Sequence, residues 1–479
     1  MDKKIFTNYM YNLTFQMLNI ILPFITTPYV ARVLGATGVG QYNYVYGIVS
    51  YFGIFAVTGT ATYAQREIAK QHSSIELRSK IFWEILAFRL ISIVLVSIIY
   101  VIYIFNYLVE YRLLFIINFF TIFSWALDVS WYFQGIEDFK VTAVRNSLVR
   151  IFSTIFIFIL VKSKHDVWIY TLVLTSGIFF GNLTMIPYLK REIVKCSITI
   201  IDIFKNTKGI MALFLPVIAI QLYTVLNKVM LGAMTSAKEV GYYSQANQII
   251  NIGTTVIYAF VAVLTPRIAF FYSEGKFSKI KSYMSTSIRN VYFLGLPMTF
   301  GCIAIANSFV PIFFGNGYNP VIYLMKIMSV LFIIMGLDQL VGTFLVSMDK
   351  QNIFTIAVSV AALVNVILNF CFIKLGYGAK GVAYATVISE MCTTIIEIIG
   401  LRKYINIRDL LYFFWKYLVP SFVMLVTILI VNYFLYASIL GLMLEILIAI
   451  IVYSLCLIII KDPAIFMIIN GLLNRKSEN

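Results

Sequence analysis

Charged residues are scarce in this sequence. Asp, Glu, Lys and Arg make up 12% of its 479 residues, whereas hydrophobic residues make up 61% and the mean hydropathy is +0.90. Soluble globular proteins have about a quarter of their residues charged, so this composition excludes that class. The apolar stretches leave no room for a sizeable domain outside the membrane, and we therefore expect no active site on such a domain.

Histidine, cysteine and phosphate-binding motifs are also scarce. The 2 His residues fall in predicted loops, so no buried imidazole is expected to relay protons. The 5 Cys residues stand singly, without the spacing of a metal site, and we expect them to be inert. No G-x-x-x-x-G-K-[ST] loop occurs, which argues against ATP hydrolysis. We predict no metal, no cofactor and no enzymatic site.

Long apolar runs predict an all-α integral membrane protein with about fourteen transmembrane helices. The first run is too long for a signal peptide, and no small-residue cleavage site follows it. The predicted spans are residues 8–34, 41–63, 81–105, 111–133, 141–161, 167–189, 208–234, 241–266, 287–314, 321–347, 352–373, 380–400, 411–435 and 440–460.

An internal repeat divides these spans into two sets. Val39-Gly40-Gln41-Tyr42 matches Val240-Gly241-Tyr242-Tyr243, and Arg66 matches Arg267 at the same offset. An even number of spans separates these points, so the two lobes share one orientation and are pseudo-symmetric, as in many transporters. We predict an N-lobe of six helices in 1–206, a C-lobe of six in 207–403, and two further helices in 404–479. Apolar residues are interspersed with basic ones in residues 189–208, which predicts either a short amphipathic helix on the inner membrane surface or a plain linker.

Basic residues fall mostly in alternate loops, which places both termini in the cytoplasm. The net charge of +16 is then explained by insertion and by contact with anionic membrane lipids. Nucleic-acid binding is not expected, because the basic residues form no stripe with interleaved aromatic residues.

Ionisable residues inside the predicted spans are the candidate functional residues, because burying a charge in lipid costs at least about 2.5 kcal/mol. The cations would give a water-filled cavity a positive potential suited to a phosphate-bearing head group. The candidates are Arg32, Arg89, Arg150 and Lys228. The alternative for Arg32 and Lys228 is that they extend to the outer membrane surface.

Carboxylates in the spans are the candidate ion-coupling groups. Asp128 and Arg150 lie at the same depth of a predicted hairpin, so they either neutralise each other or line the cavity. Asp338 has no evident basic partner, unless one lies on a helix that the sequence does not place. It could take up H⁺, or bind Na⁺ together with the amides of Asn365 and Asn369. The candidate set is Asp338, Glu390, Asp128, Asn365 and Asn369.

Proline interrupts the first helix of each predicted lobe. Pro23 and Pro216 each remove a backbone hydrogen bond from a helix, which bends it without ending it. A bend at this position in both lobes predicts a hinge for alternating access.

Several segments in this order resemble the polysaccharide flippases of Wzx type, from the first span to about the twelfth. The matching segments are Pro28-Tyr29-Val30-Ala31-Arg32-Val33-Leu34-Gly35, Ala64-Gln65-Arg66-Glu67-Ile68-Ala69, Trp131-Tyr132-Phe133-Gln134-Gly135-Ile136-Glu137, Asn227-Lys228-Val229-Met230-Leu231-Gly232, Glu239-Val240-Gly241-Tyr242-Tyr243, and Gly381-Val382-Ala383-Tyr384-Ala385-Thr386 leading to Ser389-Glu390.

The resemblance implies membership of the multidrug/oligosaccharidyl-lipid/polysaccharide (MOP) exporter superfamily, with a MATE-like fold around a cationic cavity. It implies an undecaprenyl-diphosphate-linked oligosaccharide as substrate, turned to the outer leaflet of the bacterial cytoplasmic membrane for capsule, O-antigen or teichoic-acid export. A polysaccharide polymerase and chain-length machinery are the expected protein partners. The alternatives are a cation-coupled exporter of drugs or small molecules, which would need an acidic cavity, and a membrane scaffold that transports nothing.

Overall fold

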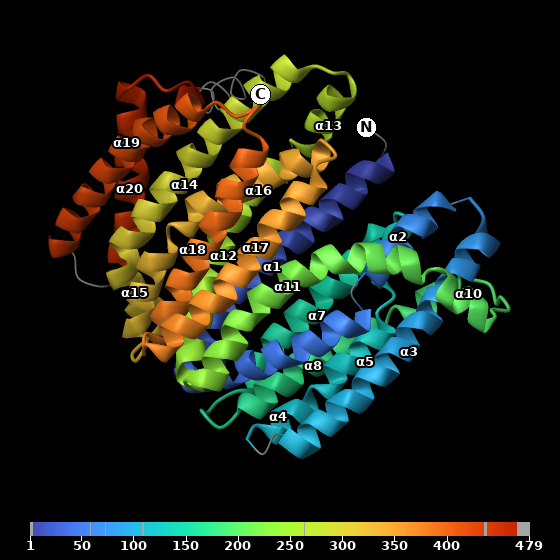
Figure 1. The fold of residues 1–479 in the computed structure, drawn as a ribbon. Helices are drawn as coiled ribbons and strands as arrows, with labels where there is room; N and C mark the ends of the chain where they lie inside the picture. Colours follow the sequence, from blue (N-terminus) through green and yellow to red (C-terminus); the bar gives the residue numbers. More distant parts are fainter. Residues whose placement is uncertain are drawn as a thin grey trace. The chain divides into compact units, whose positions relative to one another are not determined.

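The computed structural model describes residues 3–57, 59–71, 73–107, 110–262, 264–434 and 438–466, and the regular structure among them is helical, without strands. Helices are expected here because lipid offers no hydrogen bonds, so each span must satisfy its own backbone groups. The helices are α1 (Lys3–Val57), α2 (Thr60–Lys70), α3 (Ile75–Tyr107), α4 (Arg112–Ile117), α5 (Phe119–Leu127), α6 (Ser130–Gly135), α7 (Phe139–Leu160), α8 (Val167–Leu183), α9 (Ile186–Leu189), α10 (Ile200–Lys205), α11 (Thr207–Met234), α12 (Ala237–Ala262), α13 (Thr265–Ser273), α14 (Phe277–Phe314), α15 (Asn319–Met328), α16 (Leu331–Ser347), α17 (Gln351–Lys374), α18 (Gly378–Gly400), α19 (Ile407–Phe434) and α20 (Ile439–Ile459) (Figure 1).

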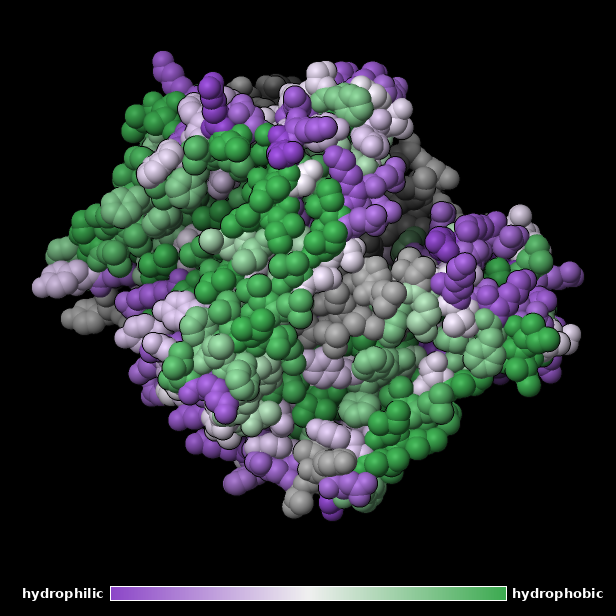
Figure 2. All heavy atoms as spheres, viewed as in Figure 1, coloured by the Kyte–Doolittle hydropathy of each residue, from purple (hydrophilic) through white to green (hydrophobic). Residues whose placement is uncertain are grey.

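The spans agree with the number expected from the sequence. Among the described residues, 11 helical stretches are long and apolar enough to cross a membrane, and the bent pair α15 and α16 makes up to 12. α1 consists of two helices joined at a kink, and α11 adds a helix of 28 residues. Together these give about fourteen spans. Figure 2 shows hydrophobic residues over the sides of the helices and hydrophilic residues gathered toward their ends.

The kink in α1 falls at a glycine. Gly35 has φ 69 and ψ 175, a conformation that costs a residue with a side chain far more than it costs glycine. The helix dihedrals continue through Pro23 and Pro28, which lie inside α1. The chain therefore turns back at Gly35, between the predicted spans 8–34 and 41–63.

Contacts group the chain into two compact units, Met1–Gly241 and Tyr242–Asn479. In the first unit α1 packs against α7, α3, α8 and α11, and α5 packs against α8, around a core that includes Val49, Phe115 and Ile122. In the second unit α18 packs against α17 and α16, and α19 packs against α14 and α20 (Figure 1). The lobe boundaries at 1–206, 207–403 and 404–479 stay a prediction.

The repeated glycines form a close backbone contact within the first unit. A Cβ atom on Gly40 would lie 1.6 Å from the carbonyl oxygen of Ala237, and one on Gly241 would lie 2.0 Å from the carbonyl oxygen of Ala36. The two contacts are related by the repeat itself, because Ala36 and Gly40 recur as Ala237 and Gly241. Small residues four apart allow two membrane helices to approach this closely. The repeat in the sequence is thus a repeated packing contact.

A short helix, α10, lies in the region for which an amphipathic helix or a linker was predicted. Thr199 caps it by accepting a hydrogen bond from the backbone of Asp202, whose carboxylate accepts one from the Thr199 backbone in return. Ile200 and Ile201 are 75% and 83% exposed. The apolar residues therefore project outward, as expected of a helix on a membrane surface.

Candidate functional site

The fourth predicted span, residues 111–133, is interrupted at a carboxylate. α5 ends because Asp128 adopts an extended conformation, with φ −74 and ψ 106. The Oδ1 atom of Asp128 accepts a hydrogen bond from the backbone N–H of Ser130, the first residue of α6, at 3.0 Å. This bond satisfies one of the donors left without a partner at the start of a helix. The break thus holds an acidic group within a membrane-spanning segment.

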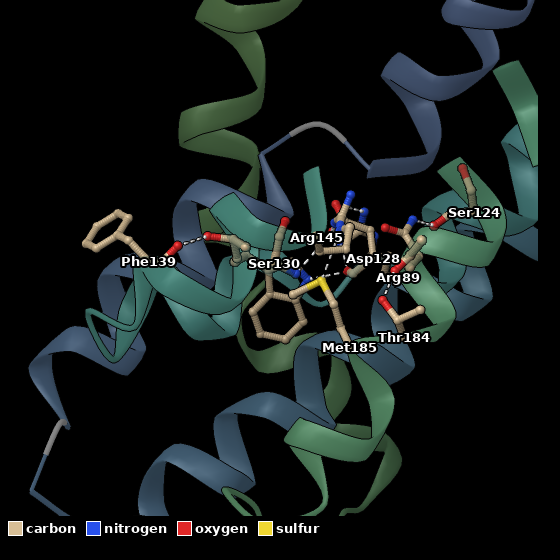
Figure 3. A network of polar contacts seen from close by, with 12 residues as sticks. Arg89, Ser124, Asp128, Ser130, Phe139, Arg145, Thr184 and Met185 are labelled. Carbon is tan, nitrogen blue, oxygen red and sulfur yellow. Dashed lines mark hydrogen bonds and ion pairs between the residues drawn. The ribbon is translucent and has the colours of Figure 1, made fainter. Parts of the chain in front are cut away.

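Two arginines from neighbouring helices face this carboxylate (Figure 3). Arg89 of α3 donates to the backbone carbonyl of Asp128 at 3.0 Å, and its Nη2 atom lies 3.7 Å from Oδ2. The Nη2 atom of Arg145, on α7, lies 3.5 Å from Oδ1. The arginine side chains are 2% and 12% exposed. These three residues, called the arginine cluster below, carry two positive charges and one negative charge.

The predicted ion pair between Asp128 and Arg150 is wrong. The hairpin argument gave the depth of Arg150 but not the direction of its side chain. Arg145 lies five residues earlier on α7, and five residues are about 140° apart around a helix, so the two arginines point to different sides. Arg145 faces Asp128, whereas Arg150 is exposed.

The other predicted cations also lie in the first unit. The ammonium group of Lys228, on α11, donates to Oδ1 of Asn43, on α1, at 3.0 Å. Among the described residues, no carboxylate lies within ion-pair distance of Lys228 or Arg150. Arg32 is exposed, three residues before the kink at Gly35. Lys228 and Arg150 are therefore not neutralised by a carboxylate in the part of the chain that the structure describes.

The other acidic candidates lie in the second unit. Asp338 is on α16, and Glu390 and Glu397 are on α18, 6% and 0% exposed. The carboxylates of all three interact electrostatically with one another. Within the described chain, Oδ1 of Asp338 and both carboxylate oxygens of Glu397 have no hydrogen-bond partner. We call these three residues the carboxylate cluster.

The two candidate amides form a chain of their own. The amide of Asn369 donates to Oδ1 of Asn365 at 2.9 Å, and the amide of Asn365 donates to Oγ of Ser389 at 3.2 Å. Both asparagines, on α17, are fully buried. The hydrogen bonds of Asn365 thus lead to α18, one residue before Glu390, and not to Asp338. The predicted joint site of these amides with Asp338 stays a prediction.

Two charged residues of these clusters were not among the sequence-based candidates. Arg145 lies inside α7, near its cytoplasmic end as predicted from the sequence, and was not singled out as a candidate. Glu397 follows Glu390 by seven residues, which is close to two helical turns, so both lie on one side of α18. That spacing is the signal that could have identified Glu397.

The predicted hinges are described only in part. Pro23 lies in a continuous stretch of α1 and is half-buried. Pro216 lies within the bounds of α11, but its side chain is outside the described residues. The hinge at both positions therefore stays a prediction.

Two family models match parts of this chain, and two known proteins are similar to it in sequence. A family model described as "Polysaccharide biosynthesis protein" matches residues 5–271, and the MatE model matches residues 212–371. The chain is 23% identical over 379 residues to a proposed O-antigen transporter of Shigella dysenteriae, covering 78% of this chain and 94% of that protein. A relative with the same description from Escherichia coli (strain K12) is 22% identical over 410 residues, covering 83% and 96%.

Solved structures show the same fold. The lipid II flippase MurJ, in an inward closed conformation, matches with a TM-score of 0.76 at 16% identity, covering 94% of this chain and 99% of that one. An inward-facing multidrug resistance MATE transporter of the MOP superfamily matches with a TM-score of 0.58 at 14% identity, covering 80% and 97%. This chain is a multi-pass membrane protein that belongs to the polysaccharide biosynthesis protein family.

Proposed function

We propose that this protein is a flippase that moves a polyprenyl-diphosphate-linked oligosaccharide across the bacterial cytoplasmic membrane by alternating access. The observation that carries the proposal is the set of cations in membrane helices of the first unit. Lys228 and Arg150 have no carboxylate partner among the described residues, and the arginine cluster has one more positive charge than negative. A phosphate-bearing head group is the ligand that such charges attract.

The physical task of a flippase requires no hydrolytic site. A diphosphate with sugars loses many hydrogen bonds and the hydration of its charge when it enters hydrocarbon, whereas its prenyl tail is stable there. The protein needs only to shelter the polar head while the tail stays in lipid. Cations that hold the diphosphate would tolerate variation in the sugars beyond it. Both termini are expected in the cytoplasm.

We further propose that the carboxylate cluster couples transport to H⁺ or Na⁺. Asp338 and Glu397 are carboxylates in membrane helices with unpartnered oxygens, and their mutual repulsion favours uptake of a cation. Asp338→Asn removes one of these charges at nearly constant volume. The variant is expected to insert normally but to lose the dependence of transport on pH or Na⁺ that the wild type has. An unchanged dependence would contradict the coupling role.

Deletion of the gene in its own host tests the flippase function. We expect undecaprenyl-linked repeat units to accumulate on the inner leaflet, because synthesis continues while translocation stops. Restoration by the wild type but not by Lys228→Gln would link the accumulation to the cations. The second candidate function is export of cationic drugs, because the carboxylate cluster would attract a cation. That function would be favoured by normal lipid-linked intermediates together with increased sensitivity to cationic drugs.

A further inference from the structure

Three tyrosines and one arginine share one side of the first unit, apart from the arginine cluster. They are Tyr42 and Tyr46 on α1, Tyr170 on α8 and Arg150 on α7. The rings of Tyr42 and Tyr46 are stacked with centroids 5.8 Å apart, and those of Tyr42 and Tyr170 meet edge to face at 4.9 Å. Arg150 is close enough to interact electrostatically with all three hydroxyl groups. We call these four residues the tyrosine patch.

The patch extends from one end of the unit toward the middle of the membrane. Tyr29 donates to the carbonyl of Val161 at 2.6 Å, so the kink in α1 and the turn between α7 and α8 lie at the same end. With a rise of 1.5 Å per residue, Tyr170 lies about 5 Å from this end and Tyr42 about 10 Å. Tyr46 and Arg150 lie about 15 Å from it, half the thickness of the hydrocarbon.

This depth argues against two ordinary explanations of the patch. Tyrosines that anchor a protein at the membrane interface lie at the head-group level, but Tyr46 lies near the middle. Arg150 is exposed near the middle of α7, and facing lipid there would cost at least about 2.5 kcal/mol. Arg150 also has no carboxylate partner among the described residues. The side of the unit that carries the patch therefore faces water or a polar ligand.

The chemistry of the patch matches that of a sugar. A pyranose ring has flat faces of C–H groups, which pack on aromatic rings, and a rim of hydroxyl groups, which need hydrogen-bond partners. Tyrosine supplies both a ring and a polar hydroxyl. Neither Tyr42 nor Tyr170 has a hydrogen-bond partner for its hydroxyl in the described part of the chain. A guanidinium group such as that of Arg150 binds phosphate or a sugar carboxylate through paired hydrogen bonds.

We propose that the tyrosine patch binds the sugar rings of a lipid-linked saccharide, while Arg150 binds the acidic group beside them. This inference rests on the proposed flippase function and adds to it a contact with the sugars themselves. The arrangement of rings from the end of the unit to its middle would offer successive sugars a similar surface. The flippase would then recognise a saccharide head group and not only its diphosphate.

The test compares two lipids that differ only in the sugar. Purified protein in nanodiscs is titrated with undecaprenyl diphosphate and with undecaprenyl-diphosphate-linked N-acetylglucosamine. Tyr42→Leu and Tyr170→Leu are expected to weaken binding of the glycosylated lipid about tenfold and to leave binding of the sugarless lipid unchanged. Arg150→Gln is expected to weaken binding of both lipids, because the acidic group beside the sugar in these lipids is the diphosphate.

Two controls keep the test decisive. Tyr42→Phe keeps the ring and is expected to retain most of the affinity, which separates ring packing from general damage to the fold. Tyr433→Leu changes a tyrosine of α19 that is 87% exposed and should change neither affinity. Equal losses for both lipids, or no loss, in the leucine variants would overturn the saccharide patch. A wild type that binds neither lipid would instead contradict the proposed function.

Discussion

The close contact between the repeated segments makes a specific prediction for Gly40. In Gly40→Ala the new methyl group would lie 1.6 Å from the carbonyl oxygen of Ala237, although carbon and oxygen normally approach no closer than about 3.4 Å. The obstacle is backbone, so no side-chain rotation can relieve it. The helices must separate by more than 1 Å, and we expect a loss of about 1–3 kcal/mol in the free energy of unfolding.

Gly47 is the matched control because it lies two turns further along α1. A Cβ atom there would lie 3.2 Å from Cγ2 of Val229, a side-chain atom that can shift by a few tenths of an ångström. Alanine is also a better helix former than glycine by about 1 kcal/mol. Gly47→Ala is therefore expected to be neutral or slightly stabilising.

Unfolding of the purified variants in detergent, followed by circular dichroism during heating, compares the two substitutions. Gly40→Ala should unfold at a lower temperature than the wild type, and Gly47→Ala should not. The repeat predicts a similar loss for Gly241→Ala, whose Cβ would lie 2.0 Å from the carbonyl oxygen of Ala36. If Gly40→Ala were as stable as Gly47→Ala, the reasoning from this contact would be refuted.

Three further predictions follow from the charged groups and the bend. Asp128→Asn leaves two neighbouring guanidinium groups without a counter-charge and should cost about 3 kcal/mol of stability, more than Arg145→Gln, which leaves one neutral pair; equal melting temperatures would contradict this. Burial raises the pKa of Asp462, but hydrogen bonds from Lys416, the Ala464 backbone and Tyr417 outweigh it and lower the pKa. The stabilisation by ionised Asp462 is therefore complete above the ordinary pKa of about 4 and is lost at lower pH. The difference in stability between the wild type and Asp462→Asn should shrink in acid. A constant difference would contradict a stabilising role of the ionised carboxylate. Pro23→Ala should slow transport, because the predicted hinge at Pro23 would be lost; an unchanged transport rate would contradict the hinge.

The number and positions of the spans could be predicted because lipid imposes long apolar helices and basic residues mark the loops between them. α7, for example, spans residues 139–160, against a predicted 141–161. The interruption of the fourth span could not be predicted, because Trp131 and its neighbours continue the apolar run beyond Asp128. The repeat could be found in the sequence as Val-Gly pairs. The close backbone contact that these glycines make could be seen only in the structure.

The partners of charged residues were the weakest part of the sequence-based analysis. Sequence gives the depth of a residue on a predicted helix, but the direction of its side chain depends on how each helix is rotated in the bundle. Arg145 and Arg150 are about 8 Å apart along the axis of α7, because each residue advances a helix by about 1.5 Å. Of the two, only Arg145 reaches Asp128. The sequence left open whether Asp338 has a basic partner, and its neighbour Glu397 was not among the predicted sites.

Translocation by the purified protein tests the central claim most directly. The protein is reconstituted in vesicles that carry an undecaprenyl-diphosphate-linked oligosaccharide on the inner leaflet only, and a membrane-impermeant lectin reports sugar that reaches the outer leaflet. We expect sugar to appear outside with the wild type and much less with Lys228→Gln or Arg150→Gln. Exposure no faster than in protein-free vesicles would contradict the claim that this chain flips lipid-linked saccharides.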